Sequence, residues 1–389
     1  MKKLVLSAAL LGLLFTGCSN DDDNNGNTQP PQEGVISGEI TSDQTFEFGT
    51  YVLDGIVRIK SGATATFDAG STITANMANG VDAIVVENGG RLIINGTAAQ
   101  PVVFTEASKT AGSWGGIIMY GDAPIMGAGG ATTKTSEDGL ALPYGGTNPA
   151  HNGGSLRYAR VEYAGKKISD GTSEMNGFSF YSVGSGTVLE NLVSYKGADD
   201  GFEFYGGTVS ATNLISYGNF DDSFDWQDGW RGANNSNWYA YQTGTGNFAM
   251  EIEASNNNND FFPTITNITL IRESGTQTEG GSSAAEYDAI QFKKQGNGNF
   301  SNVVISGFTT TGATAVRIQD ADTNTDQVLG GKIKLTNLKI SDNTTPFAAA
   351  GATFTVNFPE NMWTESQLAT GATINNGNWS TINGVNLLQ

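Results

Sequence analysis

The sequence has 389 residues, of which 39 are acidic and 20 basic, giving a formal net charge of −19. This excess of negative charge argues against nucleic acid and anionic membrane surfaces as partners, because both would repel the chain. With 52 glycines, 9 prolines and no long helical pattern, the composition argues against a mainly helical fold, and the length suits one continuous core.

Residues 1–17, MKKLVLSAALLGLLFTG, predict a cleaved secretion signal, because two lysines precede an apolar run that ends in small residues. The string FTGC, which ends at Cys18, resembles a bacterial lipobox and implies that lipid is attached to this cysteine. The alternative is an ordinary signal followed by an incidental cysteine. Because Cys18 is the chain's single cysteine, we expect no internal disulfide. No later apolar run approaches the roughly 20 residues of a membrane span, so the lipid would be the only anchor.

Residues 18–33 predict the lipidated cysteine and a flexible acidic tether, because they are polar and include prolines. The run 21–23, three aspartates that follow the cysteine after Ser19 and Asn20, resembles the signal that sends some lipoproteins to the outer face of the outer membrane. The alternative is a tether that is merely solvated. We therefore expect a lipid-anchored outer-membrane protein that faces the cell exterior.

Residues 34–344 read as short strands separated by Gly, Asn and Asp, beginning with VRIK, ATATF, STITA, AIVV, RLIIN and PVVFT. Residues 121–154 break this pattern and predict a long projecting loop, which in a compact domain is more often functional than idle. His151, the single histidine, lies in that loop, where we expect it to be exposed and without a role. A second loop is expected near 273–287. Residues 345–389 predict a cap over the open end, with a short helix at 360–369.

Residues 188–231 contain one phrase of about 22 residues twice. A period of this length predicts a solenoid, in which each repeat is one unit stacked on the next. Each repeat holds about three short strands, which predicts a right-handed parallel β-helix with coils about 4.8 Å apart. The matched positions are Leu192 with Leu214, Tyr195 with Tyr217, Phe202 with Phe224, Glu203 with Asp225, and Phe204 with Trp226.

The densest acidic cluster lies in the same stretch. If the aromatic side chains point inward, Glu203 and Asp225 stack on the outer face, one strand spacing apart. Like charges at about 5 Å repel unless a cation, a proton or a basic side chain offsets them. Extending the register adds Ser179 before these residues and Glu251, Gln291 and Arg317 after them. The turns before the strands contribute Asp199, Asp200, Asp221 and Asp222, and Asp228 follows nearby.

Three interpretations of this carboxylate ladder compete. The aspartates could be turn formers that cap backbone N–H groups. They could bind Ca²⁺, which takes several oxygen ligands; the candidate metal ligands are Asp200, Glu203, Asp222 and Asp225. They could also act as acids and bases on a glycosidic bond, or support elimination from a uronate sugar together with calcium. Lys196 and Arg231 are the nearby basic candidates for such chemistry.

Aromatic residues accompany the acids. Trp226 is predicted to be core from its strand phase. Trp230 and Trp238 flank a Gly/Asn-rich turn, where an exposed ring would suit the face of a sugar. The alternative is that both pack under the loop.

The phrases WGGIIMYGDAPI, YGGTNPAHNGGSLRYARVEYAG and GADDGFEFYGGTVSATNLISYGNFDDSFDWQDGWRG resemble a family of secreted right-handed β-helix proteins, frequent among Gram-negative envelope lipoproteins. The resemblance covers most of residues 35–340 and implies fold and location, but no activity, because none is established for that family. The wider pectin-lyase-like superfamily includes polysaccharide lyases, polygalacturonases and non-catalytic adhesins. The string 197–201, GADDG, is similar to the polygalacturonase Asp-Asp motif, but a downstream Gly-His-Gly and Arg-x-Lys are absent.

We therefore predict a surface lipoprotein that acts as a non-catalytic binding module for extracellular glycan or another envelope component, with Ca²⁺ as the candidate cofactor at the ladder. The first alternative is a Ca²⁺-dependent polysaccharide lyase or glycoside hydrolase that uses the same ladder. The second is a structural accessory of an outer-membrane uptake complex.

Overall fold

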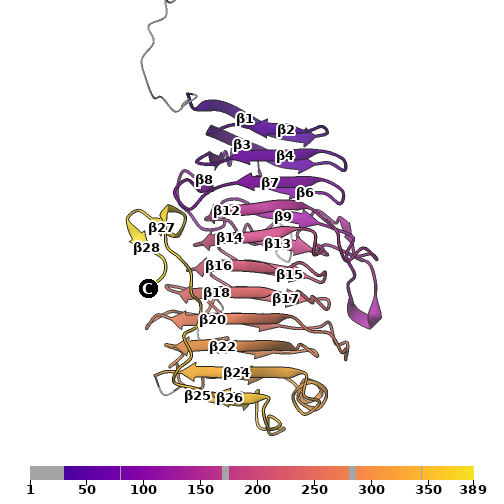
Figure 1. The fold of residues 1–389 in the computed structure, drawn as a ribbon, viewed down its shortest axis with the longest axis vertical. Coiled ribbons are helices and arrows are strands. Elements are labelled where there is room, and N and C mark those ends of the chain that lie inside the picture. The colour runs from indigo at the N-terminus through magenta and orange to yellow at the C-terminus, as the bar shows by residue number, and fades with distance from the viewer. Residues whose placement is uncertain (1–29, 79, 169–174, 280–285, 343) are drawn as a thin grey trace, which may run out of the picture. The chain divides into compact units, whose positions relative to one another are not determined.

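Short parallel strands, stacked coil upon coil, form one long sheet that runs through the described part of the chain (Figure 1). The computed structural model describes residues 30–389 except 79, 169–174, 280–285 and 343. The predicted signal at 1–17, Cys18 and most of the tether lie outside these residues, so those predictions stay untested. Among the described residues, no helix is long and apolar enough to cross a bilayer.

The coils have three faces. One face, the cleft ladder, consists of β6 (Ala83–Val86), β9 (Ile117–Tyr120), β13 (Phe178–Tyr181), β15 (Phe202–Tyr205), β17 (Phe224–Gln227), β19 (Met250–Ile252), β21 (Ile290–Phe292), β23 (Thr314–Ile318) and β25 (Thr345–Ala349). The other two faces share the long strands β12 (Gly154–Glu162), β14 (Val188–Tyr195), β16 (Ala211–Tyr217), β18 (Asn235–Gln242), β20 (Thr264–Arg272), β22 (Gly298–Ser306) and β24 (Ile333–Ile340). This arrangement confirms the predicted right-handed parallel β-helix.

The remaining elements lie at the ends and in the loops. The first coils contain β1 (Gln32–Ile40), β2 (Gln44–Phe46), β3 (Gly49–Ile59), β4 (Thr64–Asp68), β5 (Thr72–Ala75), β7 (Arg91–Asn95) and β8 (Val102–Glu106), and the last contains β26 (Trp363–Glu365). Two antiparallel hairpins are β10 (Lys134–Thr135) with β11 (Pro143–Tyr144), and β27 (Thr381–Ile382) with β28 (Val385–Asn386). The helical turns are η1 (Ala128–Gly130), α1 (Ala321–Thr323), η3 (Asn324–Val328) and η4 (Asn378–Ser380).

The repeat register predicted from residues 188–231 is confirmed. Leu192 pairs with Leu214 between β14 and β16, and Phe202 pairs with Phe224 between β15 and β17. The equivalent aromatic rings stack inside the coils, with ring centres 5.0 Å apart for Phe178 and Phe202 and 5.7 Å for Phe202 and Phe224. Because aromatic side chains bury a large apolar area, these columns supply much of the core that holds neighbouring coils together.

Asparagine side chains form a second column, at the bend in each long strand from β14 to β24. Six stacked asparagines adopt positive φ values, which Asn tolerates better than most residues because its short side chain hydrogen-bonds locally. Asn267 donates to Asn237 Oδ1 at 3.2 Å and accepts from Asn302 Nδ2 at 2.7 Å. The six, with φ from 55° to 62°, are Asn191, Asn213, Asn237, Asn267, Asn302 and Asn337. This asparagine column therefore fixes the corner between the two faces that share the long strands.

The predicted boundaries of the solenoid are too narrow at both ends. Gln32, expected in the tether, already pairs with Gly49 in β3. Beyond residue 344, β25 and β26 continue the stacking on β23 and β24. The helix predicted at 360–369 is wrong, because the central residues of that segment form β26. By pairing with the exposed edge of the last strand, β26 satisfies the backbone hydrogen-bonding groups of that edge. A helical turn at this place would leave those groups unpaired.

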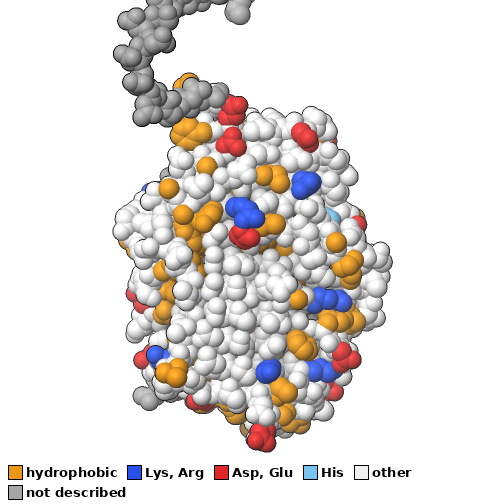
Figure 2. Space-filling view, viewed as in Figure 1, with side chains coloured by type: hydrophobic (Ala, Val, Ile, Leu, Met, Phe, Trp, Pro, Cys, Tyr) orange, Lys and Arg blue, Asp and Glu red, His pale blue; other side chains and the backbone are white. Residues whose placement is uncertain are grey.

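After β26 the chain does not stay at the end, but runs back along the coils (yellow in Figure 1). Residues 369–389, here called the strap, contact the asparagine column, where the Thr373 N–H donates to Asn237 Oδ1 at 3.2 Å. Further along, Arg160 in β12 donates to the carbonyl oxygens of Asn378 and Thr381. The face seen in Figure 2 has hydrophobic groups and only scattered charged side chains. The strap is thus held there mainly by neutral hydrogen bonds and apolar contacts.

The asparagine column gives a stability prediction. Asn267→Ala removes two side-chain hydrogen bonds and places Ala at a φ of 62°, so we expect a loss of about 2–4 kcal/mol in the free energy of unfolding, measured by urea denaturation. The control is Asn361→Ala, at an exposed position with a φ of 66° outside the column, where only the strain of about 1–2 kcal/mol applies. Equal losses in the two variants would show that the column contributes nothing.

Candidate functional site

The outward positions of the cleft ladder follow the predicted register. Inward aromatic and aliphatic residues alternate with outward polar residues, because successive side chains of a strand point to opposite faces. The outward column runs in order through Ser179, Glu203, Asp225, Glu251, Gln291 and Arg317, each paired with the next. Glu203 is nevertheless only 5% exposed, because loops cover this face of the sheet. The ladder therefore lies at the bottom of a cleft, not on an open surface.

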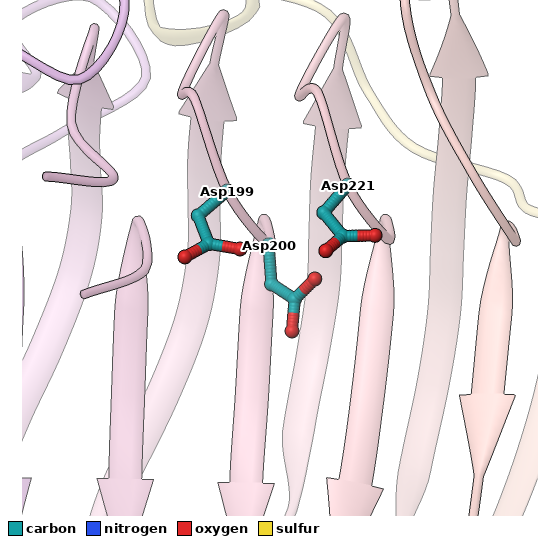
Figure 3. Close-up of side chains that lie close together, drawn as sticks. All are labelled: Asp199, Asp200 and Asp221. Carbon is teal, nitrogen blue, oxygen red and sulfur yellow. The ribbon is translucent and has the colours of Figure 1, made fainter. Parts of the chain in front are cut away.

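The aspartates of the preceding turns lie beside this column. Figure 3 shows Asp199, Asp200 and Asp221 with their carboxylates turned toward one another. Asp200 Oδ1 accepts the Asp222 N–H at 2.9 Å, and Asp222 Oδ1 accepts the Phe248 N–H at 2.7 Å. Each of these two bonds joins one coil to the next, as the turn-former interpretation expects, but it uses only one oxygen of the carboxylate.

Three overlapping groups of carboxylates have oxygens within 4.8 Å of one another. They are Asp199 with Asp200 and Asp221, Asp200 with Glu203 and Asp225, and Asp222 with Asp225 and Glu251. All four residues predicted as metal ligands thus belong to one continuous cluster, and Asp200 and Asp225 each connect two groups. Unless a cation or protons intervene, so many carboxylates at this spacing repel one another strongly.

The cluster lines a cleft of about 580 Å³. Of the described residues, eleven carboxylates and two lysines face it: Glu137, Asp199, Asp200, Glu203, Asp221, Asp222, Asp225, Glu251, Glu253, Glu279 and Glu286, with Lys293 and Lys294. Lys293 forms an ion pair with Glu251 and approaches Glu253 at 3.8 Å, while Lys294 Nζ contacts Glu253 at 2.6 Å. The lysines therefore neutralise only one side of the cleft.

Asp225 supplies the observation that distinguishes this cluster from a set of turn residues. Its side chain is 9% exposed and lines the cleft, yet its Oδ1 has no hydrogen-bond partner among the described residues. A buried carboxylate oxygen without a partner is costly, and native proteins rarely keep one without a reason. A cation or a proton in the cleft would supply the missing interaction.

Burial and mutual repulsion make these acids weak. Burial, together with the charge of Glu137, raises the pKa of Glu203 to about 8, and burial with the charge of Glu279 raises the pKa of Asp221 to about 7. The pKa values of Asp200, Asp222 and Asp225 are also raised well above the usual range, chiefly by burial. Burial alone would lower the pKa of Lys293, but the carboxylates of Glu251 and Asp225 raise it overall.

Two predictions about nearby residues are wrong. Trp230 and Trp238 are 1% and 0% exposed, and their indole N–H groups donate to the carbonyl oxygens of Val209 and Ala211. Both rings stack with Phe204 inside the coils, so neither can form a platform for a sugar. Large aromatic rings at a coil corner bury more apolar area, and so stabilise the fold more, when they pack into the core than when they lie in an exposed turn.

Three other predicted site residues lie elsewhere. Asp228 is fully buried and accepts hydrogen bonds from Lys134, Tyr144 and Ser255, outside the cleft lining. Arg231 stacks on the ring of Phe261, and the Lys196 ammonium lies over its neighbour Tyr195. Neither basic residue faces the carboxylates. The predicted site residues therefore divide into those that line the cleft and those that lie outside it.

The loop at 121–154 projects as predicted and returns to the sheet, where Tyr144 packs against Tyr181 with ring centres 5.0 Å apart. Asp228 anchors this return through Tyr144 and Lys134. His151 is 5% exposed, so its predicted exposure is wrong; the Gly184 N–H approaches its Nδ1 at 3.4 Å. Burial of the ring lowers its pKa.

The sequence reasoning missed several residues of the cleft. Glu137 comes from the 121–154 loop, and Glu279 and Glu286 from the loop near 273–287. Loop residues carry no periodic signal that assigns them to a face of the sheet. Lys293, in contrast, follows the ladder position Gln291 by two residues, so the strand alternation could have placed it on the outer face.

With this geometry established, the chain was compared with known proteins. A scan against protein-family models matches residues 38–382 to the pectate-lyase like beta helix domain. The chain belongs to the pectate-lyase-like β-helix family. No curated protein and no solved structure matches it. Members of one fold class can differ in chemistry, so membership of this β-helix family establishes the scaffold, and function must be argued from the cleft.

The raised pKa values predict how the stability of this β-helix depends on pH. Between the ordinary carboxyl value of about 4.5 and the raised value of about 8 for Glu203, the folded protein holds protons that the unfolded chain has released. Stability without divalent cations should therefore fall as the pH rises from 5 to 8, measured as the urea midpoint in EDTA. A midpoint that rises over this range would show that the carboxylates are ionised and offset in the folded state.

The loop anchor gives a separate prediction. Lys134→Met leaves the buried Asp228 carboxylate without its cation, so we expect a loss of about 3 kcal/mol in the free energy of unfolding and faster proteolysis within 121–154. The exposed Lys334→Met on β24 is the control and should change neither. Unchanged proteolysis in Lys134→Met would contradict the anchoring role.

Proposed function

We propose that this β-helix is a non-catalytic, Ca²⁺-dependent binding module for extracellular glycan, carried by a surface lipoprotein. The observation that supports the proposal most directly is the buried cluster of carboxylates with an unpartnered oxygen on Asp225. Calcium takes six to eight oxygen ligands in flexible geometry, and carboxylates from several stacked coils offer such a set.

The residues fit a hard cation better than any other group. Asp200, Glu203 and Asp225 form one set of oxygen donors, and Asp222, Asp225 and Glu251 form the next, while no histidine or cysteine lines the cleft among the described residues. Oxygen donors without nitrogen or sulfur favour calcium or magnesium over transition metals. When bound, the cation would offset the repulsion and present a positive charge to an acidic group of the ligand.

The basic residues argue against elimination chemistry. An elimination needs an unprotonated base near the cation, but Lys293 is held in its charged form by Glu251. Arg317 is paired with Asp288, its Nε lying 3.0 Å from Oδ2, and Arg231 lies outside the cleft lining. We therefore favour binding over a lyase activity.

One observation favours the alternative of a glycoside hydrolase. Glu203 has a pKa raised to about 8 and lies near two other carboxylates, which is the arrangement expected of a general acid beside a nucleophile or base. Its oxygens, however, already accept hydrogen bonds from Asn176, Tyr205 and Gln227. A general acid must donate its proton to the leaving group, and these donors instead stabilise the charged carboxylate.

The proposed location rests on the sequence. The apolar signal, Cys18 and the acidic tether support a lipid-anchored protein on the outer face of the outer membrane. Replacement of Cys18 by Ala should move the protein from the membrane fraction to the soluble fraction, and intact cells should expose the wild-type β-helix to added protease. Co-purification with a membrane complex, with neither calcium nor glycan binding, would instead support the accessory role in uptake.

Calcium binding gives the sharpest prediction, read by calorimetric melting in EDTA and in millimolar calcium. If calcium is present at about 100 times its dissociation constant, it should stabilise the wild type by about 2.7 kcal/mol. Asp225→Asn should be more stable than wild type in EDTA, because it removes a buried repelling charge, and should lose most of the calcium effect.

The control for this prediction is Asp260→Asn, because the Asp260 side chain is 93% exposed and lies outside the cleft lining. This variant should keep the full calcium effect. A wild-type protein that melts at the same temperature in EDTA and in calcium would rule out the cation site and leave the aspartates as turn formers.

The absence of catalysis is tested separately. Calcium-loaded protein incubated with uronate polymers should release neither unsaturated products nor new reducing ends. Release of either product by the wild type would establish the enzyme alternative, and its loss in a folded Glu203→Gln variant would place Glu203 in the catalytic site.

A further inference from the structure

The cleft continues into a second groove segment along the same ladder. This segment has a volume of about 590 Å³ and shares Glu251, Glu286 and Lys293 with the acidic cleft. It then adds Tyr287, Gln291, Gln319 and Arg317. The two segments meet at the Lys293 ion pair and follow successive coils, so an extended ligand could occupy both.

The chemistry of the groove changes where the segments meet. Among the described residues, the second segment adds no carboxylate of its own to those it shares with the cleft. Its one additional cation, Arg317, is already paired with Asp288. The Nε and one terminal nitrogen of Arg317 contact the Asp288 carboxylate at 3.0 and 2.9 Å. The guanidinium also donates to the carbonyl oxygens of Gly312 and Ala349. A bidentate pair of this kind leaves no free charge for an anionic ligand.

What the second segment offers is neutral hydrogen bonding. Gln291 Nε2 donates to Gln319 Oε1 at 3.2 Å, which fixes the two amides relative to each other. This bond leaves Gln291 Oε1 as an acceptor and Gln319 Nε2 as a donor on the groove side, since the structure shows no protein partner for either atom among the described residues. Tyr287 adds a half-buried ring and a hydroxyl next to Gly312. Paired amides and a tyrosine suit the hydroxyl groups and apolar faces of an uncharged sugar.

We propose that the ligand is an acidic heteroglycan, in which an acidic sugar bound at the cation cleft is followed by a neutral sugar over Gln291 and Gln319. The inference rests on the proposed function and specifies its ligand class. Glu251, Gln291 and Arg317 are on successive coils about 4.8 Å apart, so the two sugars are close neighbours along one chain.

The same geometry disfavours the simpler polymers. A uniformly acidic chain would place a second carboxylate over the amides, where both cations of the segment, Lys293 and Arg317, are already paired with acids and cannot offset its desolvation. A uniformly neutral chain would leave the cation without an acidic partner. The whole groove thus selects for a glycan in which an acidic sugar is followed by a neutral one. Neither segment alone would select for this order.

Isothermal titration of the full-length mature protein in calcium tests this inference with three polymers. Gellan carries isolated glucuronates among neutral sugars, polygalacturonate is acidic throughout, and dextran is neutral. We expect gellan to bind at least about tenfold more tightly than polygalacturonate, and dextran not to bind.

Variants separate the two segments. Gln319→Ala, at an exposed position, and Gln291→Ala should each weaken gellan binding about five- to tenfold while leaving the calcium-induced rise in melting temperature unchanged. The matched control is Gln44→Ala in β2, an exposed glutamine outside both segments. Because Gln319 is exposed, its variant keeps the test valid even if Gln291→Ala unfolds.

The outcomes distinguish this inference from the proposed function. Calcium binding without a preference for gellan, or equal gellan affinity in Gln319→Ala and wild type, overturns the heteroglycan inference and leaves the cation site standing. An absence of any calcium effect on melting overturns both.

Discussion

Everything in this protein depends on the stacking of equivalent residues at one strand spacing. In a parallel β-helix, whatever side chain one coil places at a position meets the same position of the next coil about 4.8 Å away. For Phe202 and Phe224 this repetition stabilises the core, and for the asparagine column it creates a chain of amide hydrogen bonds. For Glu203 and Asp225 it creates repulsion, which a cation, a proton or a basic side chain must offset.

The acidic cleft therefore carries an electrostatic cost that the fold itself does not require. Its coils could have carried Ser or Thr at these positions, as β13 does at Ser179, at no electrostatic cost. Instead, loops bury the carboxylates and further weaken them as acids. The two lysines on one side leave the remaining acids short of positive charge. Such local conflict between stability and chemistry is typical of functional sites.

The sequence allowed the fold and the ladder to be predicted because both are periodic. The match of Phe202 with Phe224 and of Glu203 with Asp225 fixes register, face and spacing at once. The residues that were not predicted lie outside the repeating strand pattern. Glu137 and Glu279 reach the cleft from loops. Trp230 points inward at a corner of the coil, where the alternation of a strand does not apply. Asp228 resembles its acidic neighbours in sequence, but its long-range partner Lys134 decides its role, and that contact spans 94 residues.

The strap changes the way in which this solenoid can come apart. In a simple solenoid each coil contacts only its neighbours, so the terminal coils can detach one by one at little cost. Here residues 369–389 connect distant coils, from Asn302 in β22 to Arg160 in β12 and the carbonyl oxygen of Ala99. Unravelling from the C-terminal end must first release the contacts of the strap with coils from β22 to β12. A domain exposed to pulling forces or proteases at a cell boundary would gain resistance to progressive unzipping from its C-terminal end.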